Sequence, residues 1–123
     1  MKIIPIIGLS NSGKTTLIHA LLGKMNSLYP GQTAVIKHLG HHKHELAKGK
    51  DTTTHYERGA AVVAGIDSDK ATITLRHGSY DTIVRSLSDY GIKYAIIEGF
   101  KEEGYKKVAL GDLDVDECLL RNP

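Results

Sequence analysis

The sequence predicts an α/β protein with a mostly parallel sheet flanked by helices. Short apolar segments rich in β-branched residues alternate along the chain with segments whose apolar residues recur at helical spacing. The most apolar of the short segments have the composition of strands buried on both faces, as parallel strands are. A length of 123 residues, with 41% hydrophobic and 24% charged residues, suits one compact globular domain spanning residues 1–123.

The first predicted elements are a strand, a loop and a helix. Residues 3–7 form the strand, and Pro5 within it cannot donate a ladder hydrogen bond. Pairing therefore either begins after Pro5 or leaves the missing donor facing away from a neighbour. The helical spacing that starts at Lys14 predicts a helix that ends at Tyr29-Pro30-Gly31. Residues 33–37 are expected to form the second strand, and residues 38–51 a polar, histidine-rich loop.

The middle of the chain carries weaker patterns. Residues 52–58 are expected to form a short helix ended by Gly59. Residues 60–64 and 71–75 are small or β-branched enough to form strands.

A second amphipathic helix and a buried strand follow. Ser79 is predicted to cap a helix in which Ile83, Leu87 and Tyr90 share one face, and Gly91 is predicted to end it. The next strand covers residues 94–97 and is followed by Glu98. Segments 108–110 and 118–120 are too short to assign from their pattern.

The loop between the first strand and the first helix matches the Walker A pattern for binding phosphate. It reads Gly8-Leu9-Ser10-Asn11-Ser12-Gly13-Lys14-Thr15, followed by Thr16. In such a loop the backbone N–H groups and the helix N-terminus cradle phosphates, Lys14 neutralises the β- and γ-phosphates, and Thr15 ligates magnesium. An ordinary glycine-rich turn explains this sequence less well. We therefore predict a P-loop NTPase-like fold with a single nucleotide-binding domain.

Two acids are candidates for the metal. Glu98 follows a buried strand, where a phosphate-loop protein needs an acid that holds a magnesium-bound water or orients the attacking water. The alternative for Glu98 is an exposed acid at a strand end. Asp51 either approaches the magnesium or caps the short helix that follows it, while Lys50 can approach a phosphate.

Several features of fast or base-specific enzymes are absent from the sequence. There is no Asn-Lys-x-Asp run to read guanine, so the residues leave the base open. There is no arginine-rich lid, since Arg58, Arg76 and Arg85 are isolated, so efficient catalysis by this chain alone is not expected.

The histidines and the overall charge suggest little beyond this site. His38, His41, His42 and His44 lie close together, but the spacing and the lack of a nearby cysteine do not favour a metal site over a polar loop. The net charge of +2 is spread along the chain, which predicts binding to neither nucleic acid nor a membrane surface. With Cys118 as the only cysteine and no signal or membrane-spanning segment, we expect a cytoplasmic protein.

Five ordered blocks together resemble the MobB family of molybdopterin-guanine dinucleotide biosynthesis adapter proteins. They are the phosphate loop, Val35-Ile36-Lys37-His38 with His41-His42, Gly49-Lys50-Asp51-Thr52, Glu57-Arg58-Gly59-Ala60 and Ile97-Glu98-Gly99-Phe100-Lys101. Two features depart from the family pattern. Leu39-Gly40 separates the histidines from the Lys-His pair, and the chain ends sooner than the family usually does.

The resemblance implies a GTP-binding homodimer with weak GTPase activity that works with Mg²⁺. Its implied partner is the molybdenum cofactor guanylyltransferase that attaches GMP to molybdopterin, and the cofactor or molybdopterin enzymes are indirect partners. Lys14, with Gly13, Thr15 and Thr16, would hold phosphate and magnesium, and Glu98 would be the strand-end acid. Lys37, His38, Asp51 and Lys101 match motif positions to which no individual role is assigned.

Three other classes of protein share parts of this pattern. They are a small-molecule kinase of the P-loop class, a histidine-rich GTPase that inserts a metal such as nickel, and a module that binds nucleotide without hydrolysing it.

Overall fold

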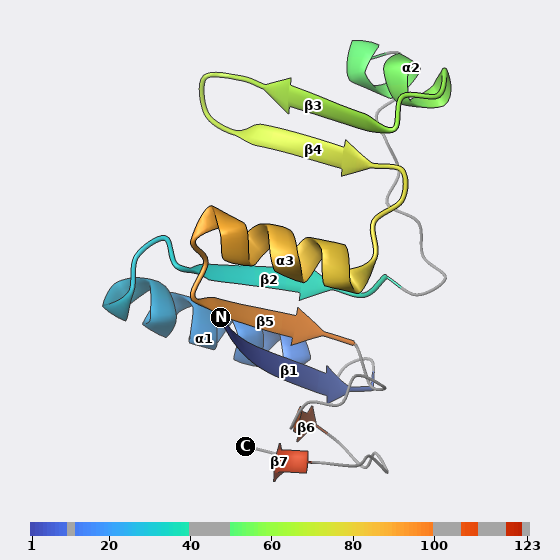
Figure 1. Ribbon diagram of the computed structural model, residues 1–123. Helices are drawn as coiled ribbons and strands as arrows, with labels where there is room; N and C mark the ends of the chain where they lie inside the picture. The colour runs from blue at the N-terminus through green and yellow to red at the C-terminus, as the bar shows by residue number, and fades with distance from the viewer. Residues whose placement is uncertain (10–11, 40–49, 100–106, 111–117, 122–123) are drawn as a thin grey trace. The chain divides into compact units, whose positions relative to one another are not determined.

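The chain folds into two compact units. The computed structural model describes residues 1–9, 12–39, 50–99, 107–110 and 118–121 (Figure 1). One unit comprises Met1–His41 and Ser86–Pro123, and the other comprises His42–Arg85. The predicted fold class, a mostly parallel sheet flanked by helices, is confirmed. A single nucleotide-binding domain over residues 1–123 stays a prediction.

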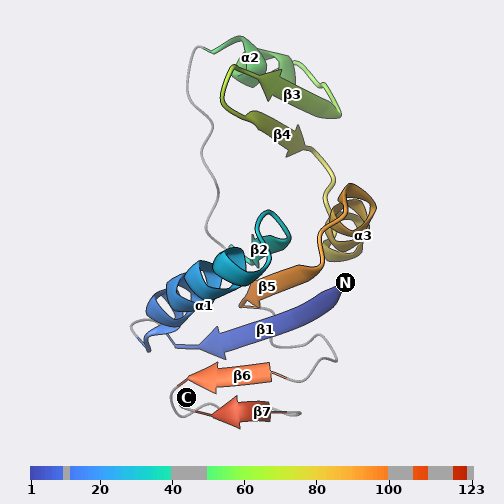
Figure 2. The same ribbon diagram turned by 90° about the vertical axis from the view of Figure 1, so that its left-hand side faces the viewer.

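The first unit contains a five-stranded parallel sheet in the order β2-β5-β1-β6-β7. The strands are β1 (Lys2–Gly8), β2 (Thr33–Lys37), β5 (Tyr94–Glu98), β6 (Lys107–Leu110) and β7 (Cys118–Arg121). Figure 2 shows the arrows of β5, β1, β6 and β7 pointing in one direction. Parallel strands end at a common edge, so the carboxyl end of β1 lies beside that of β5.

Pro5 is accommodated in the centre of this sheet. The backbone N–H of Lys2 and the carbonyl of Ile6 both bond toward the β5 side, to Lys93 and Gly99. Since hydrogen-bonding direction alternates along a strand, Pro5 faces the other side, toward β6. Pairing with β6 begins only at Ile6, with Val108 as its partner. The first predicted alternative therefore holds on the β6 side, where pairing begins after Pro5, and on the β5 side Pro5 has no bond to make because it faces away from that strand.

The helix α1 (Lys14–Leu28) covers one face of the sheet. Ile6, Ile18 and Ile96 form the buried cluster, against which Leu17, Leu21, Leu22, Met25, Ile4 and Val108 pack. The helical spacing that predicted α1 is thus the spacing of the residues that contact the sheet. At the far end of α1, the rings of Tyr29 and Tyr94 lie 5.3 Å apart, which ties the helix end to the start of β5.

The second unit consists of a short helix and an antiparallel hairpin. The helix α2 (Asp51–Glu57) precedes β3 (Val62–Ile66) and β4 (Ala71–Leu75), and the two strands pair only with each other. The third strand begins two residues later than predicted. The N–H of Ala60 donates to the carbonyl of His55 at the end of α2, so Ala60 still belongs to the helix end, and the bond from the N–H of Arg76 to the Ala61 carbonyl leads into the strand pairing.

The helix α3 (Tyr80–Tyr90) runs across the boundary between the units. Its predicted cap is confirmed, because Ser79 Oγ accepts a hydrogen bond from the N–H of Thr82 at 3.1 Å. Ile83 and Leu87 are half-buried as their spacing suggests. Tyr90 lies at the last helical position and is 85% exposed, so the predicted face does not extend to it.

Candidate functional site

The loop after β1 opens directly into the helix α1. Gly13 is the residue before the helix and has a φ of +95°, a left-handed conformation that side chains strongly disfavour. The first helical bond runs from the N–H of Leu17 to the carbonyl of Gly13 at 3.0 Å. The amides of Lys14, Thr15 and Thr16 come before that bond, and no side chain caps them. Free N–H groups at a helix start attract anions.

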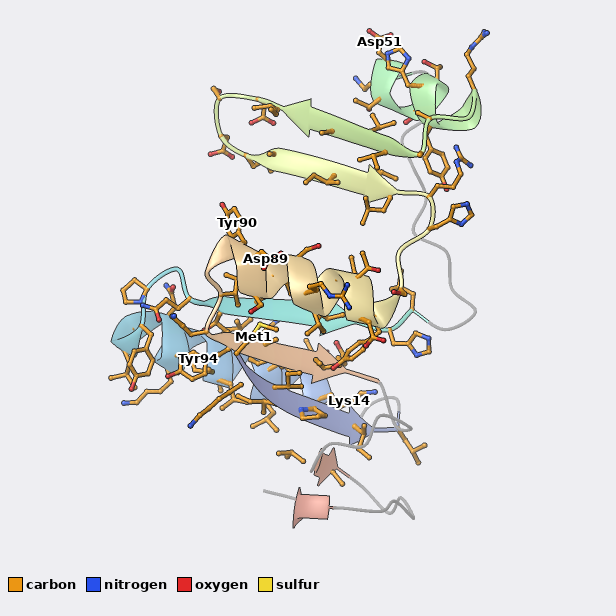
Figure 3. The ribbon with its side chains drawn as sticks, viewed as in Figure 1. Met1, Lys14, Asp51, Asp89, Tyr90 and Tyr94 are labelled. Atoms are coloured by element: carbon orange, nitrogen blue, oxygen red, sulfur yellow. The ribbon has the colours of Figure 1, made fainter. Side chains whose placement is uncertain are left out.

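A pocket of about 350 Å³ lies at this helix start and is lined by Ser12, Gly13, Lys14, Thr15 and Thr16. Gly8 is the last residue of β1, and the ammonium of Lys14 donates to its carbonyl at 2.7 Å. Figure 3 shows Lys14 by the arrowhead of β1, with Tyr94 toward the opposite end of the sheet. The predicted loop residues from Ser12 to Thr16 are therefore brought together around one hollow.

Ser12 contributes a feature that the sequence pattern did not single out. Its Oγ is closed off from solvent and has no hydrogen-bond partner in the described part of the chain. A buried hydroxyl without a partner costs free energy, so its presence in the lining of the pocket fits a ligand that supplies the missing bond.

Glu98 occupies the end of β5, the strand next to β1. The register pairs Glu98 with Ile6 of β1 and, on the other side, with Lys37 of β2. Because side chains alternate along strands, Glu98 shares a face with Ile6 and Ile96, which is the face that α1 covers. Glu98 is half-buried there, at the sheet edge where α1 begins. The structure thus sets the predicted acid on the same edge and face as the phosphate loop.

Lys37 and His38 end β2 beside this acid. Lys37 is exposed, and it is the cross-strand neighbour of Glu98. The backbone N–H of His38 donates to the carbonyl of Glu98 at 2.9 Å, which continues the pairing past the end of the strand. Two of the motif positions without an assigned role are therefore held at the edge that carries the loop.

The remaining predicted site residues are not brought together by the described structure. Ser10, Asn11 and Lys101, with His41, His42 and His44, lie outside the described residues. Asp51 begins α2 in the second unit, and its approach to magnesium stays a prediction. Its alternative role as a helix cap is wrong, because Lys50 occupies the cap position and no side chain makes a capping bond there. Figure 3 labels Asp51 on α2.

Arg76, which looked isolated in the sequence, has a packing role in the second unit. Its guanidinium lies 4.0 Å from the centre of the Tyr56 ring and donates to the carbonyls of Tyr56 and Ala60. Only the fold reveals these contacts, because Arg76 is far from both residues in the sequence.

Membrane-spanning helices and clusters of metal-binding side chains are both absent from the described residues. None of the described helices is long and apolar enough to cross a membrane. In the same residues, no group of three or more His, Cys, Asp or Glu side chains is arranged to hold a metal ion.

A parallel sheet with a Gly-Lys-Thr loop at the carboxyl end of a central strand, opening into a helix, defines a protein of the P-loop type. The family model described as "Molybdopterin guanine dinucleotide synthesis protein B", MobB, matches residues 3–121. The chain belongs to this family.

Two curated relatives are provisionally named molybdopterin-guanine dinucleotide biosynthesis adapter proteins. The one from Methanocaldococcus jannaschii is 36% identical over 102 residues, which are 83% of this chain and 42% of the relative. The one from Bacillus subtilis is 33% identical over 113 residues, 88% of this chain and 64% of the relative. The chain thus spans less than two thirds of the length of either.

Solved structures of MobB proteins share the fold. The crystal structure of Bacillus subtilis MobB matches with a TM-score of 0.76 at 28% identity. The match covers 89% of this chain and 68% of the Bacillus subtilis chain. A crystal structure of molybdopterin-guanine biosynthesis protein B has a TM-score of 0.66 at 30% identity, covering 87% of this chain and 66% of its own.

Proposed function

We propose that this chain binds GTP with Mg²⁺ at the phosphate loop and acts as an adapter in the biosynthesis of molybdopterin-guanine dinucleotide. The observation that carries the nucleotide proposal is the start of α1. There, three uncapped amides and the Lys14 ammonium lie at a pocket whose described lining is Ser12 to Thr16. This combination of backbone donors and one cation suits the β- and γ-phosphates of a nucleotide.

The residues at this edge fit a magnesium ion. Magnesium prefers oxygen ligands, and Thr15 and Glu98 supply a hydroxyl and a carboxylate on one edge of the sheet, with Asp51 a further candidate. The unpartnered Ser12 hydroxyl also fits a ligand oxygen in the pocket. When bound, the ion neutralises charge on the β- and γ-phosphate oxygens.

The chain's own groups have separate tasks in this proposal. The loop from Gly8 through Ser10, Asn11 and Gly13 wraps the phosphates with its backbone. Lys14 exchanges its bond to the Gly8 carbonyl for bonds to phosphate oxygens. Thr15 contacts the ion, and Thr16 contacts a phosphate. Glu98 orients the attacking water. Lys37, His38 and Lys101 are the further candidates for contacts to the nucleotide.

The proposal includes a preference for guanine and slow turnover, and the guanine dinucleotide in the family's description supports the first. Arg58, Arg76 and Arg85 are isolated in the sequence, and Arg76 packs on Tyr56 within the second unit. Without an arginine-rich lid to stabilise charge, hydrolysis by this chain alone is expected to be slow. The partner is the molybdenum cofactor guanylyltransferase, which transfers GMP to molybdopterin, and the chain acts as a homodimer.

The nucleotide proposal is tested by calorimetric titration of GTP and of ATP, each with Mg²⁺ and with EDTA. Tighter binding of GTP that depends on Mg²⁺ supports the proposal. Tighter binding of ATP favours the P-loop kinase class, and a subsequent screen for a phosphoryl acceptor would identify its substrate. If neither nucleotide binds, the proposal is overturned.

The adapter proposal needs a separate experiment. GMP transfer to molybdopterin by the purified guanylyltransferase is measured with and without this chain and GTP, together with co-elution of the two proteins. Faster transfer or a stable complex supports the adapter role. If a preparation that binds GTP shows neither faster transfer nor a complex, the adapter role is contradicted.

Equilibrium dialysis with nickel and zinc tests the metal-insertion class, because a protein of that class would bind a stoichiometric amount of the ion.

A further inference from the structure

A single peptide unit joins three strand ends at the edge of the sheet that carries the phosphate loop. The carbonyl of Glu98 accepts the N–H of His38, just after β2, at 2.9 Å. The N–H of Gly99, on the other side of the same peptide, donates to the carbonyl of Ile6 in β1 at 3.3 Å. In a planar trans peptide these two groups point in opposite directions, so the unit bridges β2 and β1 across the end of β5 (Figure 1).

Gly99 leaves the bridging peptide in a left-handed backbone conformation. Its φ is +97°, in the region that residues with a side chain rarely adopt. The space around it is not the obstacle, because a methyl group on Gly99 would meet Cβ and the carbonyl oxygen of His38 at 3.5 Å, an ordinary contact distance. A side chain at this position is therefore opposed by the φ angle, and relief of that strain rotates the bridging peptide.

We propose that Gly99 is a positioning residue for the nucleotide site, which holds Glu98 and the Lys37-His38 corner at a fixed distance from the phosphate loop. This inference rests on the proposed binding of GTP and Mg²⁺. The bridge sets the spacing between the end of β1, where the loop begins, and Glu98, which would hold the ion. Rotation of the peptide moves Glu98 relative to Thr15, and groups that orient metal ligands typically change metal affinity by about 10- to 100-fold when they are lost.

The chain contains a matched control for the strain itself. Gly91 also has a φ of +97°, and nothing lies within 4 Å of a Cβ built on it. It follows α3 and does not contact the phosphate-loop edge through any described hydrogen bond, since its N–H donates to the carbonyl of Ser88. Gly91→Ala and Gly99→Ala therefore impose the same backbone conformation on alanine at two different places.

The experiment measures two quantities in the wild-type protein, Gly99→Ala and Gly91→Ala. The first is the Mg²⁺ concentration needed for half-maximal GTP binding. We expect it to rise about tenfold in Gly99→Ala and to stay within about twofold of wild type in Gly91→Ala. The second is amide hydrogen exchange at His38, expected to be about tenfold faster in Gly99→Ala alone because the bridging bond is weakened. If Gly99→Ala does not fold, Gly99→Asn replaces it, because asparagine tolerates positive φ better than alanine.

The outcomes separate this inference from the proposed function. A wild-type protein that binds no GTP refutes the proposed function and the inference with it. A wild-type protein that binds GTP, with the same Mg²⁺ requirement in both variants and unchanged exchange at His38, overturns the positioning role alone. A shift in both quantities that is confined to the Gly99 variants supports it.

Discussion

Replacing Lys14 by alanine separates the role of this lysine in binding from its role in folding. The Lys14 ammonium donates to the Gly8 carbonyl at 2.7 Å, and both residues are half-buried. In the ligand-free protein the variant loses this one bond. In the proposed nucleotide complex it loses the one side-chain cation among the described residues that line the pocket.

The two losses differ in size. Two unit charges about 4 Å apart interact by about 4 kcal/mol at the effective dielectric constant typical near a protein surface. Releasing the ammonium from Gly8 offsets part of this, so we expect a net loss of about 3 kcal/mol in binding, or roughly 150-fold in Kd. The cost to folding is about 1 kcal/mol or less, because water can reach the half-buried Gly8 carbonyl and replace the donor.

Calorimetric titration of GTP with Mg²⁺ measures the first quantity, and urea unfolding measures the second. Lys24→Ala is the control, because Lys24 is an exposed lysine on the same helix. It is expected to leave both quantities unchanged. A folded Lys14→Ala protein whose Kd for GTP stays within about threefold of wild type would refute the assignment of this loop to phosphate.

Three further predictions concern the elements that support the site. Ile96→Ala removes a fully buried side chain beneath α1 and is expected to lower the free energy of unfolding by about 3 kcal/mol in urea, whereas Val35→Ala, its 43% exposed register neighbour, should cost far less. Ser79→Ala removes the cap of α3 and should cost about 1 kcal/mol, and a thermal melt unchanged from wild type would show that the cap does not stabilise the helix. The backbone N–H groups of Lys70 and Asp69 lower the pKa of Asp67 below its usual 3.8, so the hairpin turn is stabilised above that pH and loses this stabilisation as the pH falls through the lowered pKa. An NMR titration that placed the pKa of Asp67 at or above 3.8 would contradict those hydrogen bonds.

The bounds of several elements followed from the pattern of residues alone. The first helix begins at Lys14, the second strand covers Thr33–Lys37, and the fourth covers Ala71–Leu75, all as expected. The segment from Lys14 has clear helical spacing and Thr33–Lys37 has the composition of a strand, so local preference and tertiary packing agree there. Ala71–Leu75 lies among the weaker patterns of the sequence, and its pairing with β3 completes it as a strand. The weaker pattern after Gly59 predicted a strand start two residues too early, because the N–H of Ala60 bonds to His55 at the end of α2.

Other features depended on contacts between distant parts of the chain. The segments at Lys107–Leu110 and Cys118–Arg121 are too short to identify from their sequence alone. In the structure the first pairs with β1 as β6, and the second pairs with β6 as β7. The strands at Val62–Ile66 and Ala71–Leu75 form a separate antiparallel pair. A short strand is defined by its partner, and hydrogen-bond partners are not encoded in local sequence.

The sequence by itself was enough to predict a phosphate loop, because the glycines, Lys14 and Thr15 belong to one continuous segment whose pattern depends on local backbone geometry. It also pointed to Glu98 as the strand-end acid. Only the tertiary structure decided that Glu98 lies on the strand next to β1, on the face that α1 covers, and that one peptide at Gly99 joins β2, β5 and β1. Strand order and register arise from the burial of side chains distant in sequence, such as Ile6 and Ile96, and this long-range packing sets where the strand ends meet.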